Sequence, residues 1–342
     1  MAATVRDVAG RASVSIGTVS RYLNGQSLRD SNRERIEAAI RELNFKENII
    51  AKGLKNNRSM TVGLMISGYV DFFATQIAYN IELELEKNNY SLTVCEFNNN
   101  SQRLEKKLEF LMNRSVDGII IYVSNIYESQ MLRKCVELGI PVVSINGIIN
   151  GGEGIDSIVV DNANSSYQAI EYLIRSDHKR IAIINGQLED YTYRERMQGY
   201  VKALQEYGIK MDPALISTSY QNNFLENACQ SFIDIYNQLE RNSRPTAVFT
   251  ANMIMTYGVM KAINQLNLDC PQNISFIGFD WNPAFDVYRP PLTVVRQPEN
   301  RIGILAAKLI LDQLSGRRKS RTHITTIESQ LKINQSVAPC KE

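Results

Sequence analysis

The stretch TVRDVAGRASVSIGTVSRYLN, residues 4–24, decides how the beginning of this chain folds. Thr4 and Asp7 have the spacing of a capping box, so a helix should begin at Val5. The apolar residues of this helix recur at helical spacing, and Ser15 can then cap a second helix. The pattern predicts two short helices that meet across a tight turn.

A third helix is predicted directly afterwards. Ser31 to Glu34 repeat the capping-box spacing, and apolar residues follow with the spacing of a buried helical face. Three short helices with a tight first turn are typical of a helix-turn-helix module, whose second helix enters the DNA major groove with its N-terminal residues at the base edges. Those residues are Ser15, Ile16, Gly17, Thr18, Ser20 and Arg21. Spacing alone leaves an ordinary helical bundle open as the alternative.

The residues themselves resemble one family. Residues 4–24 closely resemble the DNA-binding head of the lactose-repressor (LacI/GalR) family, whose pattern is T-[IL]-x-D-V-A-x-x-A-G-V-S-x-x-T-V-S-R-V-L-N. Ser13 replaces the usual turn glycine, which predicts strain in that turn, and Tyr22 replaces a small aliphatic residue. The resemblance implies that Thr4 and Asn24 contact DNA together with the residues named above.

The likeness continues into residues 47–59, which resemble the hinge of the family, although Glu47 replaces a common proline. The resemblance implies further DNA contacts by Asn48, Ala51, Leu54 and Lys55. In the family this hinge becomes helical only on operator DNA, and Leu54 matches a leucine that wedges into the minor groove. An isolated eight-residue helix that contains glycine is too short to be stable, which agrees with folding on DNA. A core residue at a domain boundary is the alternative for Leu54.

Composition narrows the class of protein. The 342 residues are 44% hydrophobic and 22% charged, which excludes collagen-like, wholly disordered and disulfide-stapled chains. Residues 1–60 hold 11 Lys and Arg against 6 Asp and Glu, so this part should meet a polyanion. The five cysteines and two histidines show no metal-ligand spacing, and we expect no metal or cofactor. The apolar runs are short and the start has no apolar signal region, so we expect a cytoplasmic protein.

After Met60, short apolar strands alternate with longer helical stretches, which is typical of parallel α/β sheets. The predicted strands are 61–66, 92–95, 118–123, 141–145, 180–184, 247–250, 274–279 and 292–295. The predicted helices are 73–88, 163–175, 194–207, 224–239 and 300–314. A body of ~280 residues favours two lobes with a cleft between them.

The family resemblance extends over this body, on segments such as Val160-Asp161-Asn162, Arg196-Met197-Gln198-Gly199 and Ile277-Gly278-Phe279-Asp280. It implies an α/β protein with an all-α head. A helix-turn-helix DNA-binding domain (1–46) and a hinge (47–59) precede a two-lobed, periplasmic-binding-protein-like (Rossmann-like) body (60–342) for effector binding and dimerisation. We expect lobe 1 at about 60–160 and 292–321, lobe 2 at about 161–291 and 322–338, and three chain crossovers between them.

The resemblance also implies an effector site. Arg196, Asn252 and Asp280 match the family positions for effector contact, and they suit a polyol because arginine and carboxylate bond neighbouring hydroxyls in bidentate fashion. Further matching positions are Phe72, Phe73, Asn146, Asp161 and Gln297. Trp281 replaces an acid that often follows Asp280.

Three of these assignments have alternatives. Trp281 could stack on a sugar ring or pack a loop outside the pocket. A surface ion pair with Glu195 or Asp190 is the alternative for Arg196, and plain core packing is the alternative for Phe72 and Phe73.

Other functions lack support in the sequence. It contains no G-x-S-x-G, P-loop or H-E-x-x-H motif, so we do not expect an enzyme, although Glu189 and Asp190 could in principle form a glycosidase pair. A sugar-binding transport protein would share the body but not the head.

We therefore expect a transcription regulator, and more specifically a repressor. It should bind a pseudo-palindromic operator as a homodimer under allosteric control by a small molecule, a sugar or sugar acid. A purine, a phosphorylated metabolite or a protein co-regulator is the alternative effector. The final residues 333–342 carry no leucine heptad, which favours a dimer over a tetramer.

Overall fold

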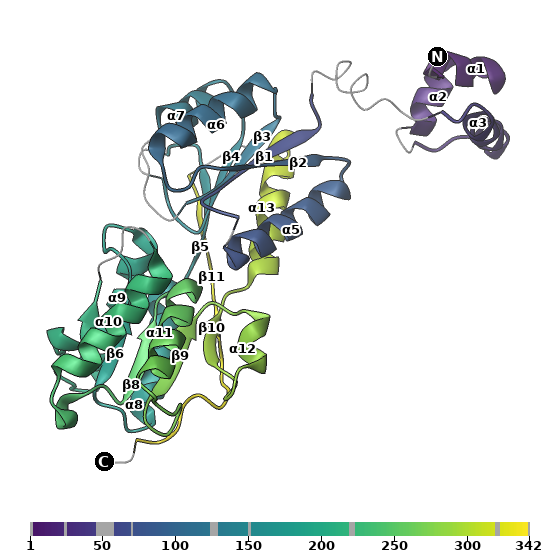
Figure 1. Cartoon of the computed structure of the whole chain (residues 1–342). Coiled ribbons are helices and arrows are strands. Elements are labelled where there is room, and N and C mark those ends of the chain that lie inside the picture. Colours follow the sequence, from purple (N-terminus) through teal and green to yellow (C-terminus); the bar gives the residue numbers. More distant parts are fainter. Residues whose placement is uncertain are drawn as a thin grey trace. The chain divides into compact units, whose positions relative to one another are not determined.

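A computed structural model of the chain describes residues 3–23, 26–45, 58–69, 71–123, 129–149, 152–218, 223–318 and 322–340. The chain divides into two compact units, Met1–Met60 and Thr61–Glu342. We call them the head and the body, and Figure 1 shows both. The described part of the head contains α1 (Val5–Arg11), α2 (Ile16–Leu23) and α3 (Asp30–Glu42).

Capping decides where the helices of the head begin. The Thr4 hydroxyl accepts the backbone N–H of Asp7 at 3.3 Å and the Asp7 carboxylate accepts that of Thr4 at 2.8 Å, so the first predicted capping box is confirmed. Ser15 Oγ accepts a backbone N–H at the start of α2 at 3.1 Å, as predicted. The second predicted capping box is wrong, because α3 begins at Asp30 and its N-cap, Arg29, makes no side-chain cap hydrogen bond. Asp30 instead places a carboxylate in the first turn, where the helix dipole stabilises it.

The three helices enclose a small apolar core. Its buried members are Val8, Ala9, Ala12, Val19, Ile36, Ala39 and Phe45. Ser13, in the turn between α1 and α2, has a φ of 54°, in the left-handed region that glycine adopts without penalty. The strain predicted for this turn is therefore present.

The body contains two six-stranded sheets, one in each lobe. The sheet of lobe 1 is parallel throughout and has the order β11-β5-β4-β3-β1-β2. Its strands are β1 (Thr61–Ile66), β2 (Ser91–Glu96), β3 (Gly118–Tyr122), β4 (Val142–Ile145), β5 (Asp156–Val160) and β11 (Ile324–Ile327). The sheet of lobe 2 has the order β12-β10-β9-β8-β6-β7, and only β12 is antiparallel to its neighbour. Its strands are β6 (Ile181–Ile184), β7 (Ile216–Ser217), β8 (Ala247–Thr250), β9 (Ser275–Phe279), β10 (Thr293–Arg296) and β12 (Gln330–Lys332).

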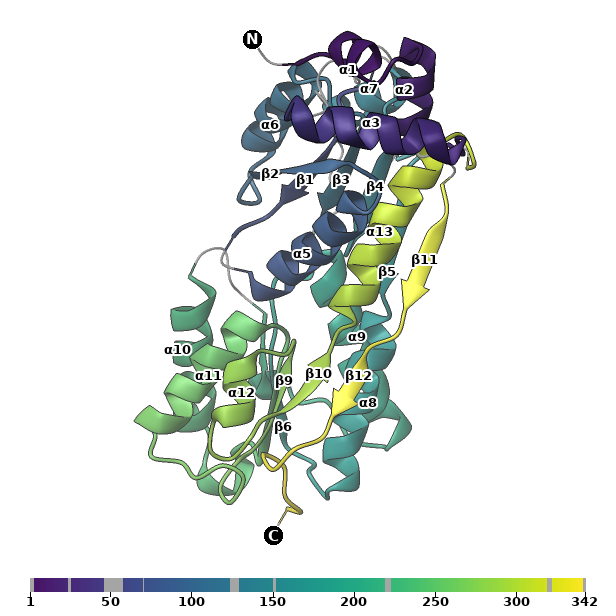
Figure 2. The same ribbon diagram turned by 90° about the vertical axis from the view of Figure 1, so that its right-hand side faces the viewer.

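Helices cover both faces of each sheet (Figures 1 and 2). In lobe 1, α6 (Ser101–Asn113) and α7 (Gln130–Glu137) cover one face, and α5 (Phe72–Glu86) and α13 (Glu299–Leu314) cover the other. In lobe 2 the pairs are α8 (Asn162–Arg175) with α9 (Tyr191–Glu206), and α10 (Phe224–Gln238) with α11 (Met253–Gln265). The short helices are α12 (Pro283–Val287), η1 (Pro213–Leu215) and η2 (Arg241–Ser243). Because successive strand residues point to opposite faces, each sheet contributes to two cores.

The predicted elements are present, with their ends shifted by at most three residues. The chain also crosses between the lobes three times, after β5, β10 and β11, as expected. Two predicted lobe boundaries are wrong. β10 lies in the sheet of lobe 2, although 292–321 was expected in lobe 1, and β11 lies in the sheet of lobe 1, although 322–338 was expected in lobe 2. The strand pairing establishes both positions, because β10 pairs with β9 and β11 pairs with β5.

None of the helices in the described residues combines the length and the apolar character that a membrane span requires.

Candidate functional site

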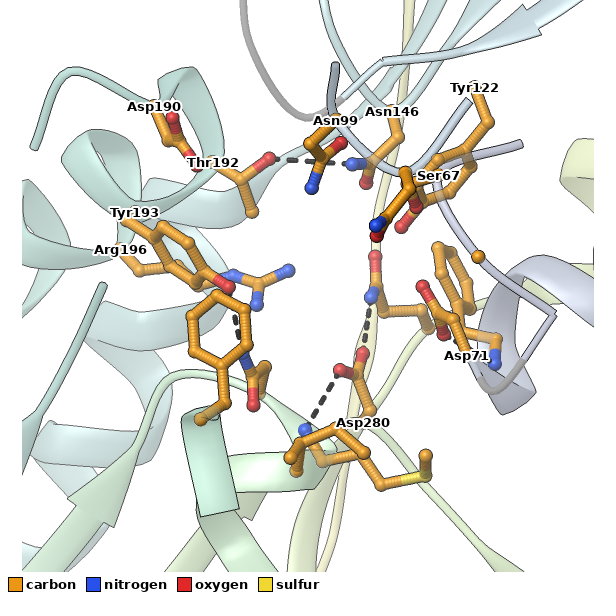
Figure 3. Close-up of a pocket in the computed structure, with 18 residues that line it drawn as sticks. Ser67, Asp71, Asn99, Tyr122, Asn146, Asp190, Thr192, Tyr193, Arg196 and Asp280 are labelled. Atoms are coloured by element: carbon orange, nitrogen blue, oxygen red, sulfur yellow. Dashed lines mark hydrogen bonds between the residues drawn. The ribbon is translucent and has the colours of Figure 1, made fainter. Parts of the chain in front are cut away.

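A cavity of about 260 Å³ lies at the carboxyl ends of strands from both lobes, and Figure 3 shows the side chains around it. Ligands of open α/β sheets bind at this edge. Lobe 1 contributes Ser67, Asp71, Phe73, Asn99, Tyr122 and Asn146 to the lining. Segments that follow the strands of lobe 2 contribute Asp190, Thr192, Tyr193, Arg196, Phe224, Asn252, Met253, Asp280 and Gln297.

Arg196 projects from α9 into the cavity, and its guanidinium points toward the centre in Figure 3. The residue is only 3% exposed. Its Nε donates to Asn162 Oδ1 at 2.9 Å, Nη1 donates to the carbonyl of Ala251, and the guanidinium lies 3.5 Å from the centre of the Phe279 ring. Burial lowers the pKa of Arg196, and the charge of Asp280 opposes that effect. A surface ion pair, the alternative for Arg196, is therefore wrong.

Asp280 follows β9 directly and is buried. Its φ of 73° lies in the left-handed region, which Asp and Asn tolerate better than other non-glycine residues. One carboxylate oxygen accepts the backbone N–H of Met253 at 3.3 Å, and the other accepts the side-chain amide of Gln297. The backbone conformation thus holds this carboxylate at the edge of the cavity.

Two asparagines join parts of the site. Asn146, after β4, donates its Nδ2 to the carbonyl of Val123 at 3.2 Å and to Thr192 Oγ1, from the other lobe, at 3.5 Å. Asn252 caps α11 and donates Nδ2 to the Tyr193 hydroxyl at 2.7 Å. Burial raises the pKa of Tyr193, so its hydroxyl keeps its proton.

Two carboxylates at the cavity were missed by the sequence analysis as ligand contacts. Asp71 caps α5 through Oδ1, which accepts the N–H groups of Phe73 at 3.0 Å and Ala74 at 3.3 Å. Burial, followed by the charge of Asp280, raises the pKa of Asp71 to about 6. Burial, followed by the charge of Glu189, also raises the pKa of Asp190 to about 6. No motif at Asp71 indicated a ligand contact, and Asp190 was considered only as half of a glycosidase pair or as an ion-pair partner of Arg196.

The aromatic candidates have different environments. Phe73 is buried, lines the cavity and meets Tyr122 edge to face at 6.2 Å between ring centres. Phe72 and Trp281 instead contact each other beside the cavity at 6.3 Å. Arg296 lies 4.4 Å from the Trp281 ring centre. Trp281 therefore packs outside the main cavity. Of the two roles considered for it, this agrees with packing a loop and not with stacking on a ligand in the cavity.

Asp161 does not line the main cavity. Its Oδ1 accepts the backbone N–H of Asn164 at 3.1 Å and so caps α8. The effector contact implied for Asp161 stays a prediction.

In the head, some of the α2 residues expected to contact DNA are exposed and one is buried. Ser15, Ile16, Gly17 and Arg21 are exposed, Ile16 by 49%, and Ser20 is partly exposed. Thr18 is buried, however, and its hydroxyl forms a 2.8 Å hydrogen bond with Ser15 Oγ. Thr18 is therefore placed to orient Ser15, and the base contact expected of it does not fit its burial.

Of the other residues expected to contact DNA, the structure describes only Thr4. Thr4 is exposed, but its hydroxyl is used in the capping box. Asn24 and the hinge residues Asn48, Ala51, Leu54 and Lys55 lie outside the described residues.

The cysteines are unpaired thiols. In the part of the chain that the structure describes, no three His, Cys, Asp or Glu side chains form a group suited to a metal ion.

A helix-turn-helix head joined to a two-lobed body with a polar cavity defines a class of protein, the DNA-binding regulators with a ligand-binding domain. Residues 4–48 match the family described as bacterial regulatory proteins, lacI family, and residues 170–337 match the periplasmic binding protein-like domain. The chain is 30% identical over 337 residues to the HTH-type transcriptional repressor PurR of Pasteurella multocida, with 98% of both chains covered. Identity to PurR of Histophilus somni strain 2336 is also 30% over 337 residues, with 98% of this chain and 99% of that protein covered. The chain belongs to the lacI family of bacterial regulatory proteins.

Solved structures agree with this assignment. The lac repressor dimer bound to operator and the anti-inducer ONPF has a TM-score of 0.80 and 25% identity, with 99% of this chain and all of that chain covered. The transcriptional regulator CelR in complex with cellobiose has a TM-score of 0.72 and 24% identity, with 98% of this chain and 99% of that chain covered, and it shows the fold alone.

Proposed function

We propose that this chain is a transcriptional repressor that binds a pseudo-palindromic operator as a homodimer and responds to a small molecule in the cavity. The observation that carries the proposal is the presence, in one chain, of an exposed first turn of α2 and a polar cavity lined by both lobes. The full-length relatives are named as repressors, and a lac repressor dimer bound to operator shares the fold, which supports the proposal.

The effector acts by population shift. A ligand that bonds both lobes stabilises one arrangement of the lobes, and in a dimer this arrangement changes the separation of the two hinges. Hinges that cannot fold together on the minor groove bind operator less tightly. Leu54 as the minor-groove wedge stays a prediction.

A hydroxyl-rich effector such as a sugar fits the cavity better than a sugar acid or a phosphorylated metabolite. Among the described residues, the lining holds three carboxyl side chains, of Asp71, Asp190 and Asp280, against one guanidinium, of Arg196. An anion would meet repulsion in a partly desolvated site, where Coulomb energies are larger than in water.

A purine is the second candidate. The name PurR, which the full-length relatives carry, favours it. The aromatic rings of Phe73, Tyr122, Tyr193 and Phe224 in the lining offer surfaces on which a base could stack.

The test combines operator binding with effector binding. An operator is selected from random DNA with the full-length protein, and its affinity is measured by fluorescence anisotropy with and without sugars and purines. Arg196→Ala and Asp280→Asn should bind operator normally but lose the response, with effector affinity lower by about 2 kcal/mol, roughly thirtyfold. Asp280→Asn keeps a residue type that tolerates the left-handed backbone.

Asp177→Asn is the matched control, because Asp177 is exposed and has a φ of 65°. Undiminished effector affinity in both cavity variants would remove Arg196 and Asp280 from the effector site. Sedimentation equilibrium of the same samples should show dimers, and a stable tetramer or monomer would contradict the proposed assembly.

A further inference from the structure

Three amide side chains in the cavity donate hydrogen bonds to other groups of the protein. Gln297 donates its Nε2 to Asp280, whose carboxylate oxygen can only accept. Asn146 donates Nδ2 to a backbone carbonyl, which also can only accept. Asn252 accepts the backbone N–H of Met255 through Oδ1 at 2.8 Å, which turns its Nδ2 toward Tyr193. These partners determine which end of each amide is nitrogen.

One of these amide oxygens, Gln297 Oε1, is left without a partner in the described part of the chain. Gln297 is 3% exposed, and its Oε1 is buried with no hydrogen-bond partner among the described residues. A buried acceptor without a partner costs the full desolvation of that group. This oxygen is therefore an unsatisfied acceptor on a residue that lines the cavity.

The carboxylates add further acceptors. Asp71 belongs to lobe 1 and Asp280 to lobe 2, and Figure 3 shows their carboxylates on the same side of the cavity. The two are close enough for the charge of Asp280 to raise the pKa of Asp71. Asp190 lies at the opposite side of Figure 3, and no ion pair of the described residues includes any of these three carboxylates.

Arg196 balances only part of this charge. Among the described residues, the lining has three acidic side chains and one basic side chain. Two of the guanidinium nitrogens are already bonded to Asn162 and Ala251. The described lining thus holds more acidic than basic side chains.

We propose that the effector carries a protonated amino group, as an amino sugar does, and that Asp71 and Asp280 bind this group from opposite lobes. This inference rests on the proposed function and specifies the effector class. An ammonium group has three N–H donors and a positive charge, which complements a lining that holds three carboxyl side chains, whereas a hydroxyl donates only one hydrogen bond and carries no charge. The bound cation also replaces the repulsion between the two carboxylates by attraction to both, so it holds the lobes together.

The test uses sets of three compounds that share one hexose skeleton: the amino sugar, the neutral sugar and the uronic acid of the gluco, galacto and manno series. Adenine and hypoxanthine complete the panel. Calorimetric titration of the full-length protein at pH 7 should show one amino sugar binding about tenfold or more tighter than its neutral counterpart, because charge-assisted hydrogen bonds are roughly twice as strong as neutral ones. The uronic acid should bind least.

The variant Asp71→Asn tests the contribution of the Asp71 carboxylate charge to effector binding. Asparagine caps helices as well as aspartate does, so α5 keeps its N-cap while the cavity loses one carboxylate. The variant should lose most of the preference for the amino sugar and keep the affinity for the neutral sugar. Glu109→Gln is the control, because Glu109 is an exposed acid on α6 outside the cavity, and it should behave as the wild type.

Operator release by each compound separates this inference from the proposed function. A neutral sugar, an acid or a purine that binds as tightly as any amine and releases operator overturns the amine inference and leaves the repressor proposal intact. An amine that binds with the expected preference but never changes operator affinity supports the amine site and overturns the effector response. A panel in which no amine binds overturns the inference, as does an Asp71→Asn variant with an unchanged preference.

Discussion

Asp71 combines a structural role with an electrostatic cost. Its carboxylate caps α5, yet burial and the charge of Asp280 raise its pKa from 3.8 to about 6. The folded state therefore binds a proton at Asp71 more tightly than the unfolded state does. The protonated Asp71 stabilises the fold below about pH 4, and this stabilisation is lost as the pH rises through 6.

Asp71→Asn removes that cost and keeps the cap. At pH 7.5 the variant should be more stable than the wild type by up to about 2 kcal/mol, and the difference should shrink towards pH 4. Urea denaturation at both pH values measures it, with Glu109→Gln as the control. A variant that is less stable than the wild type at pH 7.5 would show that the carboxylate stabilises the fold.

Arg21 is the residue of the head best placed to read a base. It is exposed at the end of α2, and arginine forms bidentate contacts with guanine. Arg21→Ala should weaken operator binding by about 1–3 kcal/mol and binding to random DNA much less. Arg11→Ala is the matched control, since it removes the same charge from α1, where Arg11 pairs with Glu42 at 2.6 Å. Equal losses on both DNAs for Arg21→Ala would reduce its role to phosphate contact.

At the scale of elements, the turn between α1 and α2 carries the strain of Ser13. A left-handed conformation costs a non-glycine residue about 1–2 kcal/mol, and part of this is offset because glycine loses more entropy on folding. Ser13→Gly should therefore stabilise the head by about 0.5–1 kcal/mol. Hydrogen exchange of the α1 and α2 amides in the full-length protein measures this. Ser20→Gly, in the interior of α2, should destabilise the head by a similar amount. Faster exchange in Ser13→Gly would contradict the strain.

The sequence predicted most of the buried central strands, but it missed the central strand β5, the helices α6, α7 and α11, and the edge strands β7, β11 and β12. β7, β11 and β12 lie at sheet edges, and none of them is fully buried. Edge strands need fewer apolar residues, so periodicity does not identify them. The wrong boundary at 322 follows from the missed β11, which pairs with β5 in lobe 1. The strand β10 was predicted, and only its pairing with β9 shows that it belongs to lobe 2.

At the scale of the whole molecule, the site joins residues that lie far apart in the sequence. Arg196, Asn252 and Asp280 were expected from the family resemblance, and the structure places all three at one cavity. The position of Asp71 near Asp280 could not be predicted, because it depends on how two lobes meet and not on any local pattern. The same holds for Trp281, whose neighbour Phe72 comes from the other lobe.

This contact makes the single tryptophan a reporter of lobe movement. Trp281 follows the cavity residue Asp280 directly, and its ring meets Phe72 at the start of α5. A ligand that changes the lobe arrangement must change the surroundings of this ring. We expect tryptophan emission to shift in step with effector binding measured by calorimetry, and Trp281→Phe to abolish the signal.

Phe72→Leu tests whether the contact contributes to closure as well as reporting it. Aromatic pairs are worth about 0.5–1.5 kcal/mol beyond the area that they bury, so the variant should weaken effector binding by up to roughly tenfold while operator affinity without effector stays the same. Phe110→Leu is the control, because Phe110 is 40% exposed on α6 away from the cavity. Saturable effector binding with unchanged emission in the wild type would mean that the Trp281 contact does not move with the lobes.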